Sequence, residues 1–216
     1  MVNEIYKSRE WKLLHPYIRA DLLPVAENVK KGTQIEIRGL QKKYEQSRLL
    51  DKWLEKSDLA HRKHKFTHYA CRDESLLDKL WEEKIGIDDF LGYPKCCIEN
   101  HREHGKKFIQ YLNDEIELSE VPLPQGVLIG REMIKAIEKG EFNPVLNYSL
   151  HMPCSIYCMD SIEFGERIKN CLEENDFEVA EYIRQFNEGS WLSFGKEWNE
   201  EIWYKFAKER KKEYCG

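Results

Sequence analysis

Four cysteines stand in two short segments that each contain a proline, "YPKCC" at 93–97 and "HMPCSIYC" at 151–158. Proline is favoured in the first turn of a helix, where the backbone N–H groups are free and the helix dipole is positive. That environment lowers the pKa of a thiol and favours the thiolate, the form that binds metals and attacks electrophiles. We therefore expect both segments to contribute to one site, formed by Cys96, Cys97, Cys154 and Cys158.

Four thiolates are the ligand set of a tetrahedral zinc ion or of an iron–sulfur cluster. Their spacing matches neither the usual zinc knuckles nor the common ferredoxin patterns. We favour an iron–sulfur cofactor with a redox or sulfur-handling role, in which His151 could fill an open coordination position. The alternative is a structural zinc site in a non-catalytic interaction module. Buried free cysteines also pack as small hydrophobic residues, so a site without metal stays open.

A third interpretation is a thiol enzyme without metal, with Cys154 as the nucleophile and His151 as its base. It requires a further group to orient the histidine, and the sequence does not locate one. His101 and His104 follow Cys97 on one helix face, but their polar surroundings favour solvent exposure. Whether the protein is an enzyme is therefore left open.

The periodicity of the chain predicts an α+β fold that is predominantly helical, with a small sheet of about three strands. Strands are expected at 33–39, 65–71 and 145–150, where apolar residues alternate with polar ones. A strand at 145–150 running into a helix that begins at Pro153 would place Cys154 at a strand-to-helix turn, where α/β folds often bind ligands. Cys158 would then follow on the same helix face.

Other helices are expected at 73–86, with Asp73 as its cap, and from Pro94 to about Leu112. The basic run "HRKHK" at 61–65 is interpreted as a solvated helix face or loop. The C-terminal part carries an aromatic and aliphatic stripe at helical spacing, which favours core or subunit packing and suggests a homo-oligomer or a protein partner. The stripe consists of Trp191, Phe194, Trp198, Ile202 and Phe206.

The length of 216 residues fits a single domain. Its expected parts are a helical N-terminal part (1–60), a cysteine-motif core (65–172) and a helical C-terminal extension (173–216). No apolar run approaches the roughly 20 residues of a membrane span, and we expect a soluble cytoplasmic protein. The net charge of −5 does not support bulk binding to nucleic acid.

Two stretches, "FLGYPKCC" at 90–97 and "HMPCSIYCMDS" at 151–161, resemble the uncharacterised, largely archaeal family of domain of unknown function 483. The resemblance covers roughly residues 65–165. The resemblance implies no activity, but it implies that these cysteines belong together as motif residues of the family. It also suggests as motif members Tyr93, Pro94, His151, Pro153, Ser155 and Ser161.

Overall fold

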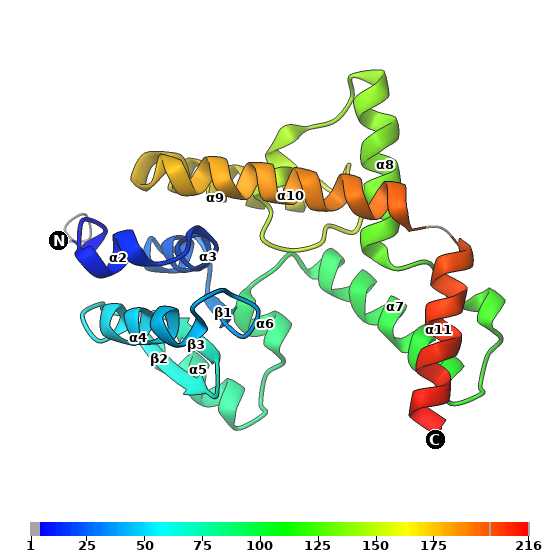
Figure 1. The fold of residues 1–216 in the computed structure, drawn as a ribbon, viewed down its shortest axis with the longest axis horizontal. Helices are drawn as coiled ribbons and strands as arrows, with labels where there is room; N and C mark the ends of the chain where they lie inside the picture. The colour runs from blue at the N-terminus through cyan, green and yellow to red at the C-terminus, as the bar shows by residue number, and fades with distance from the viewer. Residues whose placement is uncertain (1–4, 199, 216) are drawn as a thin grey trace. The chain divides into compact units, whose positions relative to one another are not determined.

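The computed structural model describes residues 5–198 and 200–215, which form two compact units (Figure 1). Unit 1 contains Met1–Tyr93 and Glu166–Arg184, and unit 2 contains Pro94–Gly165 and Gln185–Gly216. The predicted class, α+β and predominantly helical with one small sheet, is confirmed. The expectation that the whole chain is one domain stays a prediction.

The sheet lies in unit 1 and is antiparallel, with strand order β1-β3-β2. Its strands are β1 (Gly32–Glu36), β2 (Ala60–His64) and β3 (Thr67–Cys71). The two expected strands near 33–39 and 65–71 are present. The interpretation of 61–65 as helix face or loop was wrong for most of the run, because the segment pairs with β3 as an edge strand. Lys65 takes a left-handed backbone conformation (φ 56°) at the turn of this hairpin.

The other elements that lie wholly in unit 1 are helices, which precede, separate or follow the strands along the chain. Asp73 caps α5 as predicted, since its side chain accepts a hydrogen bond from the Ser75 backbone N–H. Pro16 occupies the first turn of α3. The helices are α2 (Arg9–Leu13), α3 (Pro16–Ala26), α4 (Lys43–Leu54), α5 (Glu74–Trp81) and α6 (Ile87–Leu91).

Large apolar side chains form the core of unit 1. Trp11 of α2 and Trp53 of α4 are both buried, with ring centroids 4.9 Å apart. Phe90 of α6 packs so closely on β1 that a Cβ at Gly32 would lie 2.6 Å from its ring. A larger residue at the start of β1 would therefore force the Phe90 ring to shift.

A buried ion pair lies beside that core. The Lys30 ammonium is 3.3 Å from the Asp21 carboxylate and 5.3 Å from the centroid of the Tyr93 ring. Burial acts to lower the pKa of Lys30, but Tyr93 and Asp21 outweigh it and the pKa is raised. Lys30 therefore stays protonated, as a buried amine does when paired.

Residues 166–184 complete unit 1 from the far end of the sequence. The Trp11 indole N–H donates to Asp176 over 3.0 Å, and the Arg19 guanidinium donates to the same carboxylate over 2.8 Å. Asp176 also caps the next helix, since its side chain accepts from the Val179 N–H. Two long helices thus contribute to both units: α9 (Met159–Asn175) and α10 (Phe177–Glu197).

Unit 2 is built from helices and irregular segments. At one crossing, α8 and α10 approach with backbone against backbone, because a Cβ at Gly130 would lie 2.6 Å from the Gly195 nitrogen. The elements that lie wholly in this unit are α7 (Lys95–Leu112), η1 (Leu118–Glu120), α8 (Gln125–Lys139), η2 (Pro144–Tyr148) and α11 (Glu200–Cys215).

The strand expected at 145–150 was wrong, because most of this segment forms the 3₁₀ helix η2. Pro144 stands in its first turn, and the Asn143 side chain accepts from the Val145 N–H over 3.0 Å. The Ser149 hydroxyl donates to the Leu146 carbonyl over 2.7 Å. Local side-chain hydrogen bonds therefore satisfy backbone groups that a strand would pair with a neighbour.

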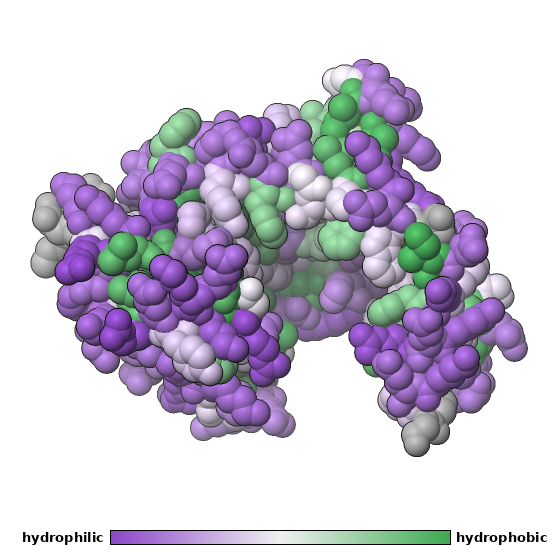
Figure 2. Space-filling view, in the orientation of Figure 1, coloured by the Kyte–Doolittle hydropathy of each residue, from purple (hydrophilic) through white to green (hydrophobic). Residues whose placement is uncertain are grey.

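The C-terminal stripe is divided between α10 and α11. Of its residues, Trp191 is buried, Trp198 and Phe206 are partly buried, and Phe194 and Ile202 are 40% and 44% exposed. None of the helices in the described part of the chain combines the length and apolar character that crossing a membrane requires. Hydrophilic residues cover most of the face seen in Figure 2, and a hydrophobic patch lies over α8 near the top.

Candidate metal centre

The sulfurs of Cys96, Cys97, Cys154 and Cys158 lie within 4.8 Å of one another, all inside unit 2. Cys96 Sγ is 3.5 Å from Cys158 Sγ and 3.8 Å from Cys97 Sγ. Cys97 Sγ is 3.8 Å from Cys158 Sγ. We call these four residues the cysteine cluster, and such a set of sulfurs could hold a metal.

The start of α7 positions the first two sulfurs. Pro94 is the N-cap of this helix, one residue earlier than the first-turn position expected for it, and Cys96 and Cys97 lie in the first turn. Neighbouring helical residues point in different directions, yet both sulfurs reach Cys158 here. Cys97 is only 3% exposed, whereas Cys96 is partly buried at the edge of the cluster.

The second segment differs from the prediction, because the helix begins at Met159 and not at Pro153. Residues 149–158 form turns without regular structure. The Ser155 side chain accepts from the Tyr157 N–H, and the Cys158 N–H donates to the Ser155 carbonyl. Such local bonds compete with helix formation. Cys154 and Cys158 therefore do not share a helix face, and they converge through the turns of the loop.

Cys158 takes the place that the prediction gave to Cys154, at the entrance of a helix. It directly precedes α9, and its carbonyl accepts from the Ile162 N–H over 3.0 Å. Burial acts to raise the pKa of Cys158, but hydrogen bonds from the side chain and backbone of Ser161 and from two neighbouring thiols lower it overall. The N-terminus of α9 thus stabilises a thiolate at Cys158.

Cys154 is held in the loop by contacts with the rest of unit 2. Its backbone N–H donates to Cys97 Sγ over 3.3 Å. The preceding carbonyl, that of Pro153, accepts a hydrogen bond from the Gln125 side-chain amide of α8. The next buried residue, Ile156, has its N–H directed to the Glu132 carboxylate over 3.3 Å. The loop is therefore attached to α8 on both sides of Cys154.

Neighbouring thiols oppose the ionisation of Cys154 and Cys96. Burial, followed by contacts with neighbouring thiols, raises the pKa of Cys154 to about 12. The same causes raise the pKa of Cys96 further. Several thiolates at these separations repel each other, and a divalent cation among them reverses that balance. The cluster therefore has the electrostatics of a cation site.

Ser161 connects the cluster with His151. The Ser161 hydroxyl is fully buried and lies 3.0 Å from both Cys97 Sγ and His151 Nε2. A hydroxyl has a single hydrogen, so when it is donated to Cys97 or to Cys158, the contact with His151 is a hydrogen bond only if Nε2 donates to the serine oxygen. The structure therefore places His151 one residue removed from the sulfurs, through Ser161.

Asp160 is a neighbour of the cluster that the sequence interpretation did not include. Its carboxylate lies 3.5 Å from Cys96 Sγ. Its position two residues after Cys158, in the first turn of α9, was visible in the sequence only once the helix start was known. His101 and His104 lie further along α7 and line a separate pocket.

A family model described as "Protein of unknown function (DUF483)" matches residues 71–186. The match covers more than half of the chain and includes the cysteine cluster, His151 and Ser161.

The chain belongs to the DUF483 family.

Membership confirms the resemblance drawn from the two cysteine motifs. The family match begins in β3 of unit 1 and ends in α10, so it includes parts of both units. The comparison with curated proteins found no match, and neither did the comparison with solved structures.

Proposed function

We propose that the cysteine cluster binds one tetrahedral zinc ion, which holds the 149–158 loop against the start of α7. The observation that carries the proposal is the spacing of the sulfurs. With a zinc–sulfur bond of about 2.3 Å, the edge of a tetrahedron of thiolates is about 3.8 Å. Three of the sulfur pairs lie at 3.5, 3.8 and 3.8 Å, and all four sulfurs lie within 4.8 Å of one another.

An iron–sulfur cofactor, the first expectation from the sequence, asks for a different arrangement. In a four-iron cluster each thiolate binds a different iron atom, so the sulfurs stand farther apart than the edge of a single tetrahedron. The close sulfurs of this family member favour one ion. Because four protein ligands leave no open position, the site resembles structural zinc centres and not catalytic ones.

The thiol-enzyme interpretation has less support. A nucleophilic cysteine needs a depressed pKa, whereas burial raises that of Cys154 to about 12. The role proposed for the protein is therefore that of a zinc-stabilised, non-catalytic module. The expectation that the C-terminal aromatic residues contact a partner or a second copy, and the cytoplasmic location, stay predictions.

Metal analysis of the purified protein tests the proposal. We expect one zinc per chain after anaerobic purification, and a visible spectrum typical of tetrahedral thiolate coordination after replacement by Co²⁺. Cys97→Ser is expected to lose the metal, because it removes a buried ligand. The matched control is Cys171→Ser, a buried cysteine of unit 1, which should retain it. Detection of iron and inorganic sulfide with broad visible absorption would show an iron–sulfur cluster in place of zinc. A metal-free protein would refute both the zinc site and the cluster.

A further inference from the structure

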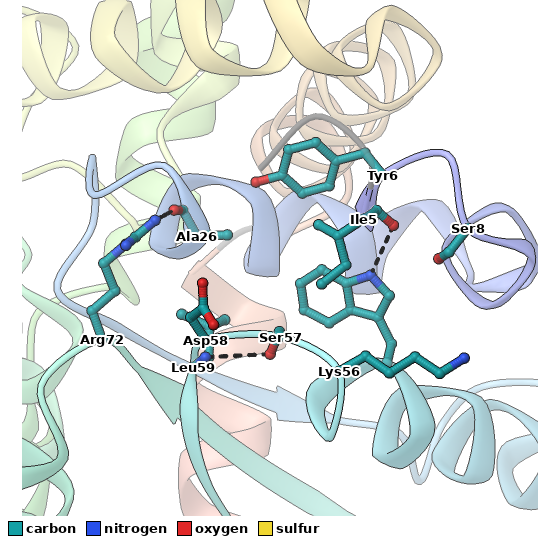
Figure 3. Close-up of a pocket in the computed structure, with 10 residues that line it drawn as sticks. Ile5, Tyr6, Ser8, Ala26, Lys56, Ser57, Asp58, Leu59 and Arg72 are labelled. Atoms are coloured by element: carbon teal, nitrogen blue, oxygen red, sulfur yellow. Dashed lines mark hydrogen bonds between the residues drawn. The ribbon is translucent and has the colours of Figure 1, made fainter. Parts of the chain in front are cut away.

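The cysteine cluster differs from the pocket of unit 1 in what its polar groups contact. In that pocket, which has a volume of about 400 Å³, the Trp53 indole N–H donates to the Ile5 carbonyl (Figure 3). The Arg72 guanidinium likewise donates to the Ala26 carbonyl. In the cluster, thiols lie against other thiols. Thiols in contact can be joined by oxidation, so the cluster offers a reaction that the groups of the pocket do not.

Cys96 and Cys158 are the two thiols best placed for such a bond. Their Sγ atoms are 3.5 Å apart, although the residues come from two distant segments of the chain. A disulfide bond is about 2.05 Å long, so the sulfurs need to approach each other by about 1.5 Å. Cys96 lies in the first turn of α7 and Cys158 directly before α9, so neither is held in the middle of a helix. Cys96 is also partly exposed, which gives a small oxidant access to its sulfur.

The contacts that Cys97 makes are less suited to a disulfide. Cys96 and Cys97 are adjacent, with Cα atoms about 3.8 Å apart, whereas disulfides usually join Cα atoms about 4.4–6.8 Å apart. Cys97 is only 3% exposed, and its Sγ lies 3.0 Å from the Ser161 hydroxyl and 3.3 Å from the Cys154 backbone nitrogen. These contacts hold the Cys97 sulfur in place and shield it from solvent. Distance and access together therefore favour the pair Cys96–Cys158.

We propose that a hydroperoxide oxidises Cys96 and Cys158 to a disulfide, which makes the cysteine cluster a redox-sensitive site. The disulfide follows from the contact between the two sulfurs and requires no metal. Its effect on the metal rests on the proposed function, in which both residues are zinc ligands. The disulfide removes two of the four thiolates, and the remaining two do not complete a tetrahedral site. Oxidation therefore releases the ion.

In the metal-free protein the reaction consumes one hydrogen peroxide for each disulfide. The Cys96 sulfur attacks one peroxide oxygen, so that an S–O bond forms, the O–O bond breaks, and the thiol proton leaves with the other oxygen as water. The Cys158 sulfur then attacks the Cys96 sulfur, so that the S–S bond forms, the S–O bond breaks, and a second water carries away the Cys158 proton. The two thiols thus lose two electrons and two protons, and the peroxide is reduced to two molecules of water.

Peptide mapping of the full-length protein detects the disulfide. Metal-free, reduced protein is treated with one equivalent of hydrogen peroxide, and the remaining thiols are alkylated. Trypsin places the first two cysteines of the cluster in the peptide 96–102 and the last two in the peptide 140–167. We expect these peptides to be joined in protein that runs as a single chain on a non-reducing gel, and to separate after treatment with dithiothreitol. Absence of the joined peptides, or a disulfide confined to 140–167, would overturn the inference.

Serine variants identify the two sulfurs, because each tryptic peptide contains two cysteines. Cys96→Ser and Cys158→Ser should reduce the yield of joined peptides at least tenfold. Cys97→Ser and Cys154→Ser are the matched controls from the same cluster, and they should keep the wild-type yield. Wild-type yield in Cys96→Ser, or loss of the joined peptides in all four variants, would contradict the assigned pair.

Zinc-loaded protein separates this inference from the proposed function. We expect each disulfide to release one Zn²⁺ to a chromophoric chelator, and dithiothreitol to restore zinc binding. Joined peptides in a protein that never binds zinc would refute the zinc site and support the disulfide. Zinc binding without joined peptides in the metal-free protein would refute the disulfide and leave the zinc site. A disulfide that forms while zinc stays bound would refute the control of metal binding by oxidation.

Discussion

Unit 1 contains buried pairs of opposite charge, whereas unit 2 brings together four groups of the same kind. In unit 1, Lys30 lies against Asp21 and Arg19 against Asp176. In unit 2, four sulfurs meet where the start of α7 and the 149–158 loop come together, and neighbouring thiols raise the pKa of Cys96 and of Cys154. The difference favours a cation as the partner of the unit 2 sulfurs, whereas the buried charges named in unit 1 already have partners.

Removing the proposed metal should have the largest effect of the changes considered. It should destabilise unit 2 and leave the stability of unit 1 unchanged. Structural zinc contributes on the order of 10 kcal/mol to small zinc domains, and this stabilisation belongs to the native state alone. After chelation we expect amide hydrogen exchange to accelerate in α7 and the 149–158 loop, and to stay slow in β3. Hydrogen exchange read by mass spectrometry measures both regions in one sample. Equal acceleration in β3 would show that unit 1 also depends on the metal.

Breaking the buried Lys30–Asp21 ion pair should instead destabilise unit 1 and leave metal binding in unit 2 unchanged. Lys30→Met leaves Asp21 as a buried carboxylate without its cation, which typically costs about 3–5 kcal/mol. Exchange should accelerate in β1 and α3, while the protein keeps its metal. The measurement is a urea titration combined with metal analysis, and Lys31→Met, on the neighbouring residue, is the control. Metal loss in Lys30→Met would contradict the independence of the cluster.

Acidification should weaken unit 1 through His68 of β3. Its ring is buried, with Nε2 3.1 Å from the Ser47 hydroxyl. Burial lowers the pKa of His68 to about 4, against the partly opposing Asp51 carboxylate. The unfolded chain, with a histidine pKa of about 6.5, binds the proton first. Stability should therefore fall as the pH drops from about 6.5 to about 4, by about 3 kcal/mol in total, and level off below that.

The difference between wild type and His68→Gln isolates this contribution, because all other titrating groups are shared. Unfolding free energies from urea titrations across this range give both slopes. The variant should show the shallower dependence. If the unfolding free energies of the two proteins change in parallel with pH, a group other than His68 causes the pH dependence.

The smallest expected effect concerns Ser161, whose hydroxyl contacts Cys97 Sγ without being one of the proposed metal ligands. Removing such an outer hydrogen bond typically lowers metal affinity about 10–100-fold. Ser161→Ala should do so, whereas Ser155→Ala in the loop should not. Competition with a chromophoric chelator measures both affinities. Unchanged metal affinity in Ser161→Ala would show that Ser161 adds nothing to the binding by the four sulfurs.

Sequence reasoning succeeded where a local side chain determines the backbone. The Asp73 cap and the helix that follows Pro94 are of this kind, because each depends on residues within one turn. It failed at 145–150, where alternating apolar residues are buried by a 3₁₀ turn and not by a sheet. It also missed β2, whose charged residues suit an exposed edge and carry no apolar alternation.

The cysteine cluster shows the same limit. Proline and cysteine spacing indicated that the two segments share a site, and their sulfurs do lie together. The route of the second segment depends on Ser155, Gln125 and Glu132, whose bonds to the loop span up to 28 residues of sequence. No local pattern reports such contacts. The helix entrance was therefore assigned to Cys154 instead of Cys158.

The interrupted order of unit 1 along the chain has a consequence for synthesis on the ribosome. Trp11 and Arg19 find their partner Asp176 only after all of Pro94–Gly165 has been added. At about 5–20 residues per second, this takes several seconds. All four residues of the cysteine cluster are synthesised before Asp176. A nascent chain therefore has all four sulfurs of the proposed metal site before unit 1, which is begun first, receives its last helical segment.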